Sequence, residues 1–154
     1  MKLNKLGLLG MLCAAGLFSN TAALAADVAN VTVNATVVGT CKFTGAGVVA
    51  FTLDPSVGGA VAGVVTQPTF WCTNGAAYNI TDNDGLHASL GVQRMKHATL
   101  AEFIPYTFGY TAAGNGTGPA TPITMNISSS VAAINYLNAS AGSYADTVVL
   151  SITP

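Results

Sequence analysis

Residues 144–154 have the sequence YADTVVLSITP. Two sets of residues alternate along the second half of this stretch: Val148, Leu150 and Ile152 against Val149, Ser151 and Thr153. An apolar residue at every second position is typical of a β-strand that lies on a hydrophobic core, because successive side chains point to opposite faces. The stretch therefore predicts an amphipathic strand over 144–154.

The same alternation occurs in VTVNATV, residues 31–37. Its apolar members, Val31, Val33, Ala35 and Val37, are separated by Thr32, Asn34 and Thr36. This pattern predicts a second strand with one apolar face. Such a strand could complete its own domain or be held out for another molecule, and the pattern alone favours the first role.

Short β-type runs separated by turn residues fill the sequence between these two strands. We expect strands within residues 47–53, 67–73, 77–81, 86–95, 102–110 and 121–128, and a further strand or irregular chain over 131–137. Residues 57–65 are rich in glycine and are interpreted as a flexible connection or a weak edge strand. In all we expect about seven to nine strands and no helix after residue 26, which is typical of an all-β sandwich or barrel.

Two local features refine this prediction. Asp82-Asn83-Asp84-Gly85 stands between the expected strands 77–81 and 86–95, and predicts a hairpin because glycine accepts the positive φ of a tight turn. Pro105 marks a bend or an edge within the aromatic run 102–110, because proline cannot donate to a strand ladder.

Residues 1–25 have the order of a secretory signal peptide. Lys2 and Lys5 precede an uncharged apolar run from Leu6 to Phe18, and a small-x-small site follows at Ala23-Leu24-Ala25. The run is too short to span a bilayer, and no later stretch is long and apolar enough to do so. We expect export and cleavage after Ala25, which leaves 154 − 25 = 129 residues, about one domain.

Few charges remain in this mature part. Lys42, Arg94 and Lys96 stand against six acidic residues, which gives a net charge of 3 − 6 = −3. Such a chain has no basic surface for nucleic acid, so nucleic acid is not an expected partner.

The cysteines indicate one disulfide bond. Cys13 lies inside the signal peptide, and Met11-Leu12 before it do not fit a lipoprotein site. Cys41 and Cys72 remain, and a single pair in an oxidising compartment is most simply a disulfide. A metal site would require further cysteine or histidine residues close to either one.

No catalytic residues, metal ligands or cofactors are expected. His87 and His97 belong to no nucleophile motif and are each interpreted as a surface or strand histidine. The spacing of these histidines and of Met95 and Met125 gives no support to a copper or zinc site. Asp82-Asn83-Asp84-Gly85 also lacks the flanking acidic residues of a calcium-binding EF-hand loop.

Several landmarks together resemble the spore coat U domain family, which includes the pilin subunits of archaic chaperone–usher pili. They are the cysteine pair, Tyr78, Arg94-Met95, Pro105-Tyr106 and the stretch Gly142-Ser143-Tyr144-Ala145-Asp146-Thr147-Val148. The last of these, with the pattern G-x-Y-x-D-T-V, is the most specific. One departure is the end, where family members often have an aromatic residue and this sequence has Thr153-Pro154.

The resemblance implies an immunoglobulin-like sandwich that lacks its final strand and is completed by a donor strand from another subunit. It divides the chain into a signal peptide (1–25), a donor-strand segment (26–39, with 28–38 inserted) and a pilin domain (40–154). The residues it assigns are a donor face of Val31, Val33, Ala35 and Val37, and a C-terminal groove-edge strand with Tyr144, Val148, Leu150 and Ile152. The implied partners are other pilin subunits, a periplasmic chaperone and an outer-membrane usher.

The function implied is that of a structural, non-enzymatic subunit of a surface pilus that supports adhesion or biofilm formation. It would pass through the periplasm to the cell surface. Two alternatives stay open at this point. One is a non-polymerising secreted coat protein, and the other is a monomeric periplasmic sandwich that binds a small ligand or a metal.

Overall fold

The computed structural model describes residues 26–154; the predicted signal peptide, 1–25, lies outside the described residues. Residues up to Ala35 and residues Thr36–Pro154 form separate units and are treated separately. Within residues 26–40 no strand is assigned, and the side chains of Val31, Val33 and Val37 are 84%, 87% and 82% exposed. In this structure the alternating segment therefore does not serve as a half-buried strand.

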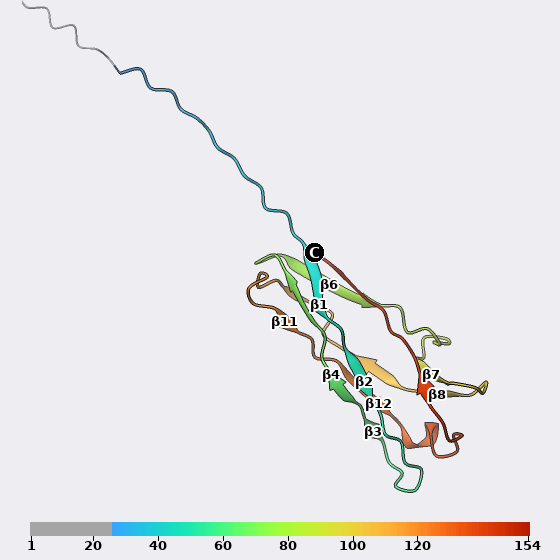
Figure 1. Cartoon of the computed structure of the whole chain (residues 1–154). Coiled ribbons are helices and arrows are strands. Elements are labelled where there is room, and N and C mark those ends of the chain that lie inside the picture. The colour runs from blue at the N-terminus through green and yellow to red at the C-terminus, as the bar shows by residue number, and fades with distance from the viewer. Residues whose placement is uncertain (1–25) are drawn as a thin grey trace, which may run out of the picture. The chain divides into compact units, whose positions relative to one another are not determined.

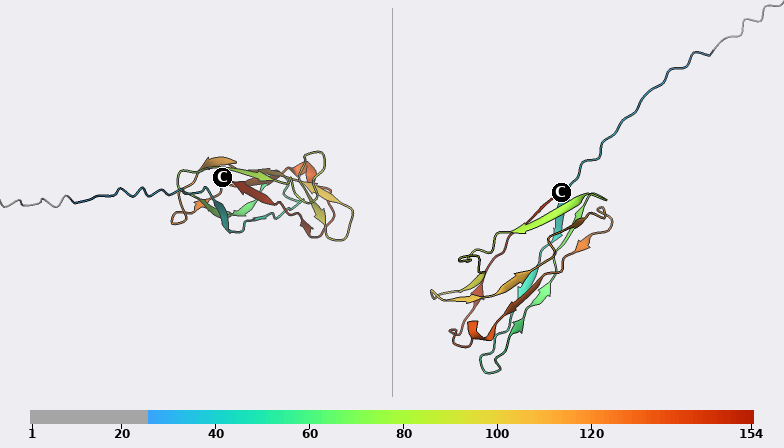
Figure 2. Two further views of the ribbon diagram at one scale, coloured as in Figure 1. Left: turned by 90° about the horizontal axis from the view of Figure 1, so that it is seen from above. Right: turned by 180° about the vertical axis from the view of Figure 1, so that it is seen from behind.

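The domain, residues 36–154, is an all-β immunoglobulin-like sandwich. Its strands pair antiparallel in small sheets of two or three, and the view from above shows two layers (Figure 2). The elements are β1 (Cys41–Gly45), β2 (Val48–Ala50), β3 (Val61–Ala62), β4 (Val64–Thr66), β5 (Thr69–Cys72), β6 (Ala77–Asp82), β7 (Arg94–His97), β8 (Phe103–Pro105), β9 (Thr107–Gly109), β10 (Ala113–Asn115), β11 (Ile123–Thr124), β12 (Ser128–Val131), the 3₁₀ helix η1 (Ala133–Asn135), β13 (Tyr144–Ala145) and β14 (Leu150–Thr153) (Figure 1).

Two hydrophobic clusters lie between the layers. One cluster joins Phe70 and Cys72 of β5 to Ile80 of β6. The other joins Ile104 of β8 and Val131 of β12 to Tyr136. Each cluster takes residues from more than one of the small sheets, so the core holds these sheets together at two points.

Many of the expected strands are broken into two short ones. The run 102–110 is divided at Tyr106, so that β8 pairs with β7 and β9 pairs with β12. Pro105, expected at a bend or an edge, ends β8, which is an edge strand of its sheet. The glycine-rich run 57–65 contains β3 and the start of β4, which agrees with the weak-edge-strand interpretation. Gly63 separates these two strands where a Cβ would lie 2.6 Å from Cγ1 of Val49, so a side chain there would require its neighbours to shift.

The hairpin expected over 77–95 is wrong. Both edges of β6 are occupied, by β10 and β14, so the chain after Asp82 cannot return along it. The turn itself forms, with Asp84 and Gly85 at positive φ, but it leads into a loop. The tight turn lies further on at Leu90-Gly91, both at positive φ, where Ser89 and Val92 form an isolated bridge.

The expected disulfide is present between Cys41 and Cys72. The two residues are directly opposite each other on β1 and β5, with their Cα atoms 4.0 Å apart. This bond ties β1, which is an edge strand, to β5 in the middle of its sheet. Cys72 is fully buried, so the disulfide also forms part of the core.

Candidate functional site: an apolar groove along two open strand edges

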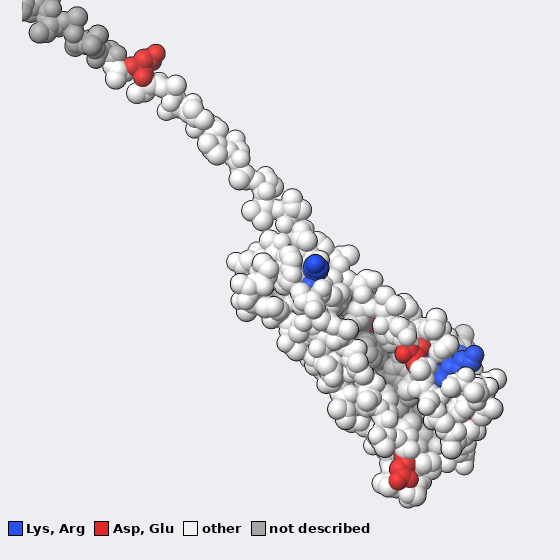
Figure 3. All heavy atoms as spheres, in the orientation of Figure 1, with Lys and Arg blue, Asp and Glu red and all other residues white. Residues whose placement is uncertain are grey.

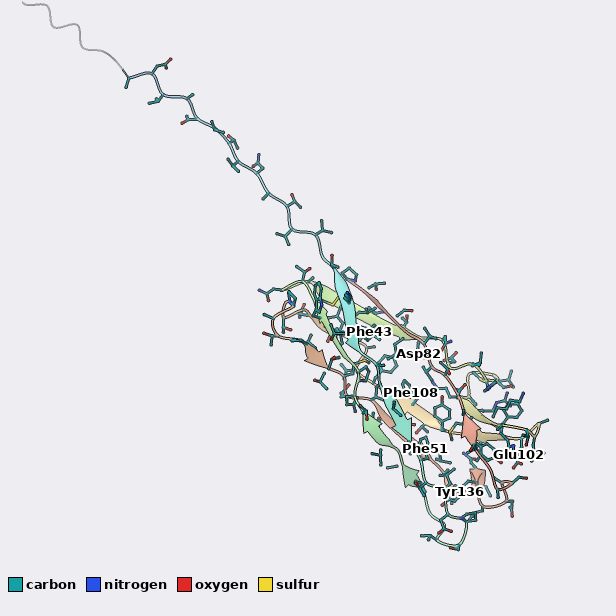
Figure 4. All side chains as sticks on the ribbon, in the orientation of Figure 1. Phe43, Phe51, Asp82, Glu102, Phe108 and Tyr136 are labelled. Carbon is teal, nitrogen blue, oxygen red and sulfur yellow. A yellow bond between two sulfur atoms is a disulfide. The ribbon has the colours of Figure 1, made fainter. Side chains whose placement is uncertain are left out.

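An apolar groove runs along one face of the domain between β1–β2 and the C-terminal segment 146–150. It encloses about 740 Å³, and Figure 3 shows this face hollowed lengthwise. Large side chains from several strands line it: Phe43, Val49, Phe51, Met95, Phe108 and Leu150. Figure 4 shows Phe43, Phe108 and Phe51 following one another along the groove.

The first wall is formed by β1, β2 and the residues next to them. Along it Phe43, Val49 and Phe51 are half-buried and face the groove, whereas Lys42 and Ala50 are exposed. The period of two explains this arrangement, because every second side chain of an extended chain points inward. From Phe43 to Phe51 the wall would extend about 26 Å at roughly 3.3 Å per residue.

The second wall is the C-terminal segment. Val148 and Leu150 line the groove, and Ile152 packs against the first core cluster. The single strand expected over 144–154 is divided in the structure: Tyr144 lies in β13, which pairs with β7, and β14 pairs with β6. Tyr144 therefore lines a neighbouring cavity rather than this groove, because its strand joins a different sheet.

Both walls present an open backbone edge. Within residues 36–154, β1 pairs only with β5 and β14 only with β6. Thr73 N–H donates to Thr40 O on the β5 side, so the backbone groups of the next residue, Cys41, face the other way. Val149 N–H likewise donates to Asn83 Oδ1 on the β6 side, so the backbone groups of Val148 face the groove. The groove is therefore lined by apolar side chains and bordered by two sets of free hydrogen-bonding groups.

The core beneath the groove is incomplete. Phe43, Phe51 and Phe108 are only half-buried, whereas Phe70 in the middle of the domain is 1% exposed. Burying an aromatic side chain is strongly favourable, and sandwiches normally cover such residues with a further strand. The arrangement can accept one extended strand that places apolar side chains between these walls.

Asp146 fixes the C-terminal wall. Its carboxylate accepts hydrogen bonds from the backbone N–H of His87, at 3.1 Å, and from the hydroxyl of Tyr106, at 2.7 Å. Asp82 makes a similar bond, accepting from the Tyr110 hydroxyl at 2.8 Å. Asp146 thus connects the second wall to the β8–β9 corner and to the loop after β6. It is the acidic residue of the G-x-Y-x-D-T-V stretch, so its place here accounts for one position of that motif.

Burial and these carboxylates raise the pKa of both phenols. Burial, the hydrogen bond to Asp146 and its negative charge raise the pKa of Tyr106 well above its ordinary value of 10. Burial, the hydrogen bond to Asp82 and the charges of Asp82 and Asp84 raise the pKa of Tyr110 to about 12. In each case the folded state favours the neutral phenol, because ionisation would place two negative charges next to each other.

Alkaline pH is therefore expected to weaken the fold. A group whose pKa is raised on folding contributes stability that is complete below its unfolded pKa, about 10, and is lost as the pH rises through the folded value. The free energy of unfolding should fall between about pH 10 and pH 12. Urea titrations across this range should show a shallower fall for a Tyr106→Phe/Tyr110→Phe variant, and an equal fall in both proteins would contradict the assignment.

The histidines have structural positions. His97 is 6% exposed in β7, and its Nδ1 accepts hydrogen bonds from the backbone N–H groups of Thr99 and Leu100, each at 3.1 Å. It is a strand histidine as expected, but it is buried. His87 lies in the loop after β6, with its ring against Phe103. Within residues 26–154 no group of three histidine, cysteine or acidic residues is placed to hold a metal ion.

Sequence reasoning missed most of the groove lining. Phe51 and Phe108 lie in runs expected to form strands, whereas Phe43 lies in β1, which no expected run covers, and the convergence of the three depends on pairings far apart in sequence. In the sequence Asp146 is recognisable only as part of the G-x-Y-x-D-T-V motif. One signal for the groove was available in the sequence. Along the first wall, inward-facing residues occupy every second position, as they do in the C-terminal strand.

The domain thus belongs to the immunoglobulin-like sandwich class and has an open groove. The chain belongs to the Spore Coat Protein U domain family, whose family model matches residues 27–151. Comparison with curated proteins gives no match. Among the residues described, no helix is long and apolar enough to cross a membrane.

One solved structure that the chain resembles is a CsuC–CsuE chaperone–tip adhesion subunit pre-assembly complex from archaic chaperone-usher Csu pili of Acinetobacter baumannii. The sequence identity is 18% and the TM-score is 0.46. The match covers 76% of this chain and 40% of that one.

Proposed function

We propose that the mature protein is a structural subunit of a surface pilus and that it polymerises by donor-strand exchange. The observation that carries this proposal is the combination, in one chain, of an open apolar groove and an exposed strand-like segment with one apolar face. Membership of the Spore Coat Protein U domain family supports it.

The donor segment fits the groove in length and pattern. Val31 to Val37 covers seven residues, about 20 Å when extended, and the first wall extends about 26 Å. Val31, Val33, Ala35 and Val37 would enter between the walls, while Thr32, Asn34 and Thr36 would face solvent. The inserted strand would form backbone hydrogen bonds with both open edges, which is β-strand addition.

The position of the chain ends supports one direction of insertion. A Cβ on Gly39 would lie 3.4 Å from Cβ of Pro154, so the domain begins and ends at one pole, here called the terminal pole (Figure 1). β14 runs toward this pole. If the inserted donor ran parallel to β14, the subunit that supplies it would lie at the terminal pole. The first subunit's own donor segment is attached at this same pole. An antiparallel donor leaves at the opposite pole, so head-to-tail growth without closure becomes possible.

Insertion requires some movement of the walls. β1 and β14 come within 8 Å of each other between Cα atoms, and Figure 1 shows that they diverge away from the terminal pole. A strand between two others needs about 10 Å from wall to wall. We therefore expect a donor to enter at the wider end and to displace β14 slightly as it advances.

The remaining partners follow from this proposal. An unfilled groove exposes apolar side chains and open strand edges, which promote aggregation, so a periplasmic chaperone would cover it until assembly. An outer-membrane usher would exchange the chaperone for the next donor. The completed filament would lie on the cell surface, with adhesion or biofilm formation as its role.

A cross-linking experiment tests the exchange between two copies. One chain carries Val33→Cys and the other carries Val148→Cys, so that only contact between different molecules can join them. We expect a disulfide-linked dimer on a non-reducing gel after co-assembly, because Val33 would enter beside Val148. A chain with Asn34→Cys is the matched control, since this residue should face solvent. Equal cross-linking by the Val33→Cys and Asn34→Cys chains, or no cross-linking by the Val33→Cys chain, would contradict donor-strand exchange.

A further inference from the structure

Residues 38–40 connect the proposed donor segment to β1, and one side chain holds them. The Thr40 N–H donates to the hydroxyl oxygen of Thr73 at 3.0 Å, and the one proton of this hydroxyl has two carbonyl acceptors, Val38 O at 3.2 Å and Thr40 O at 3.4 Å. The backbone N–H of Thr73 also donates to Thr40 O at 2.9 Å. A single threonine at the end of β5 therefore binds the chain on both sides of Gly39.

These bonds keep the connection extended. The β1–β5 register, with Cys41 opposite Cys72, continues by one residue to place Thr40 opposite Thr73. Beyond this point the Thr73 hydroxyl is the hydrogen-bonding partner that the next residue of a longer strand would provide, because it donates to the backbone carbonyl oxygen of Val38. Residues 38–40 consequently continue the line of β1 instead of turning back.

A chain that carries both a donor and a groove has an intramolecular competitor. A tethered segment reaches an effective concentration in the millimolar range, well above that of a second molecule in dilute solution. For the donor to enter its own groove, residues 38–40 would have to form a tight reversal beside β1, and the donor would then run parallel to β14, opposite to the direction proposed for exchange. Gly39 would permit such a turn, but Val38 and Thr40 would have to give up their bonds to the Thr73 hydroxyl.

We propose that Thr73 is a positioning residue that prevents the donor segment from filling the groove of its own subunit, so that the groove stays free for a second copy. This inference rests on the proposed function. It assigns to Thr73 a part in directing assembly that requires no contact with the groove. Because Val38 and Thr40 are exposed, water can replace the lost bonds, and removing the hydroxyl should leave the domain folded.

The test measures binding of a labelled synthetic peptide of residues 27–38 to the purified full-length mature chain. Thr73→Val removes the hydroxyl at nearly constant shape, and Thr73→Ser keeps it. We expect the wild type and Thr73→Ser to bind the peptide equally, and Thr73→Val to bind it about tenfold more weakly, because two hydrogen bonds no longer oppose self-insertion. Adding Val33→Asp to Thr73→Val should restore binding, since it disables the chain's own donor.

The possible outcomes separate this inference from the proposal on which it rests. Equal binding by the wild type and Thr73→Val would overturn the role of Thr73 and leave donor-strand exchange intact. Weaker binding by Thr73→Val that Val33→Asp does not restore would also overturn it, because the loss would then reflect damage to the groove. No binding by any of the chains would contradict the proposed function, and the inference with it.

Discussion

A Val33→Asp subunit should fail to assemble. In the proposed complex this side chain lies in the middle of the donor face, between apolar walls that include Phe43 and Leu150. The substitution loses the burial of a valine, about 1.5–3 kcal/mol, and places an unpaired carboxylate in the groove. An uncompensated buried charge costs about 3–5 kcal/mol, so binding should weaken by a factor of at least about 100.

The matched control is Asn34→Asp, the same charge on the next residue. Its side chain would face solvent, so assembly should proceed almost as in the wild type. Both variants should fold equally well as free subunits, because Val33 is 87% exposed there. Assembly is measured by sizing chromatography after release from a co-expressed chaperone. If Val33→Asp and Asn34→Asp assemble alike, the assignment of the donor face is wrong.

Loss of the Cys41–Cys72 disulfide should destabilise the domain strongly. The bond joins residues 31 apart in sequence, and closing a loop of this length contributes roughly 3–4 kcal/mol in the chain-entropy model. Small domains have a total free energy of unfolding of about 5–15 kcal/mol. The bond also anchors β1, the edge strand that forms one wall of the groove. A Cys41→Ala/Cys72→Ala variant should therefore lose much of its stability and bind donor peptide poorly.

Chemical reduction of the wild type provides the control for this variant. Reduction removes the covalent link but keeps both side chains. A loss of stability that is caused by losing the link should therefore appear both in the reduced wild type and in the double-alanine variant. Urea unfolding at neutral pH measures it. A free energy of unfolding that is unchanged by reduction would show that the link adds nothing to the stability of the sandwich.

The sequence was most informative where one short stretch determines the structure. The alternation at Val148, Leu150 and Ile152 predicted residues that face inward, and the cysteine pair predicted the disulfide. The predicted hairpin after Asp82 was wrong. Its residues do form the expected turn, but both edges of β6 are occupied by distant strands, so the chain cannot pair with β6 after the turn. Strand pairing depends on the whole domain, so a turn motif alone cannot determine it.

The groove could be predicted only through a family resemblance. Its walls come from the two ends of the domain, and Tyr106 and Phe108 beneath it come from the middle. Asp146 contributes through bonds to His87 and Tyr106, which are 59 and 40 residues away. Periodicity identifies which side chains face inward, but it does not indicate which strand is missing from the core.

The central claim is that the groove accepts residues 27–38 as a strand, and moving this segment within one chain tests it most directly. Pro154 lies at the terminal pole, so the segment can be placed after it, behind a short flexible linker, and removed from the N-terminus. The segment would then run antiparallel to β14, the direction proposed for assembly. The account predicts a soluble monomer whose free energy of unfolding is several kcal/mol higher than that of the native order. A rearranged chain that is no more stable and no more monomeric than the native one would contradict it.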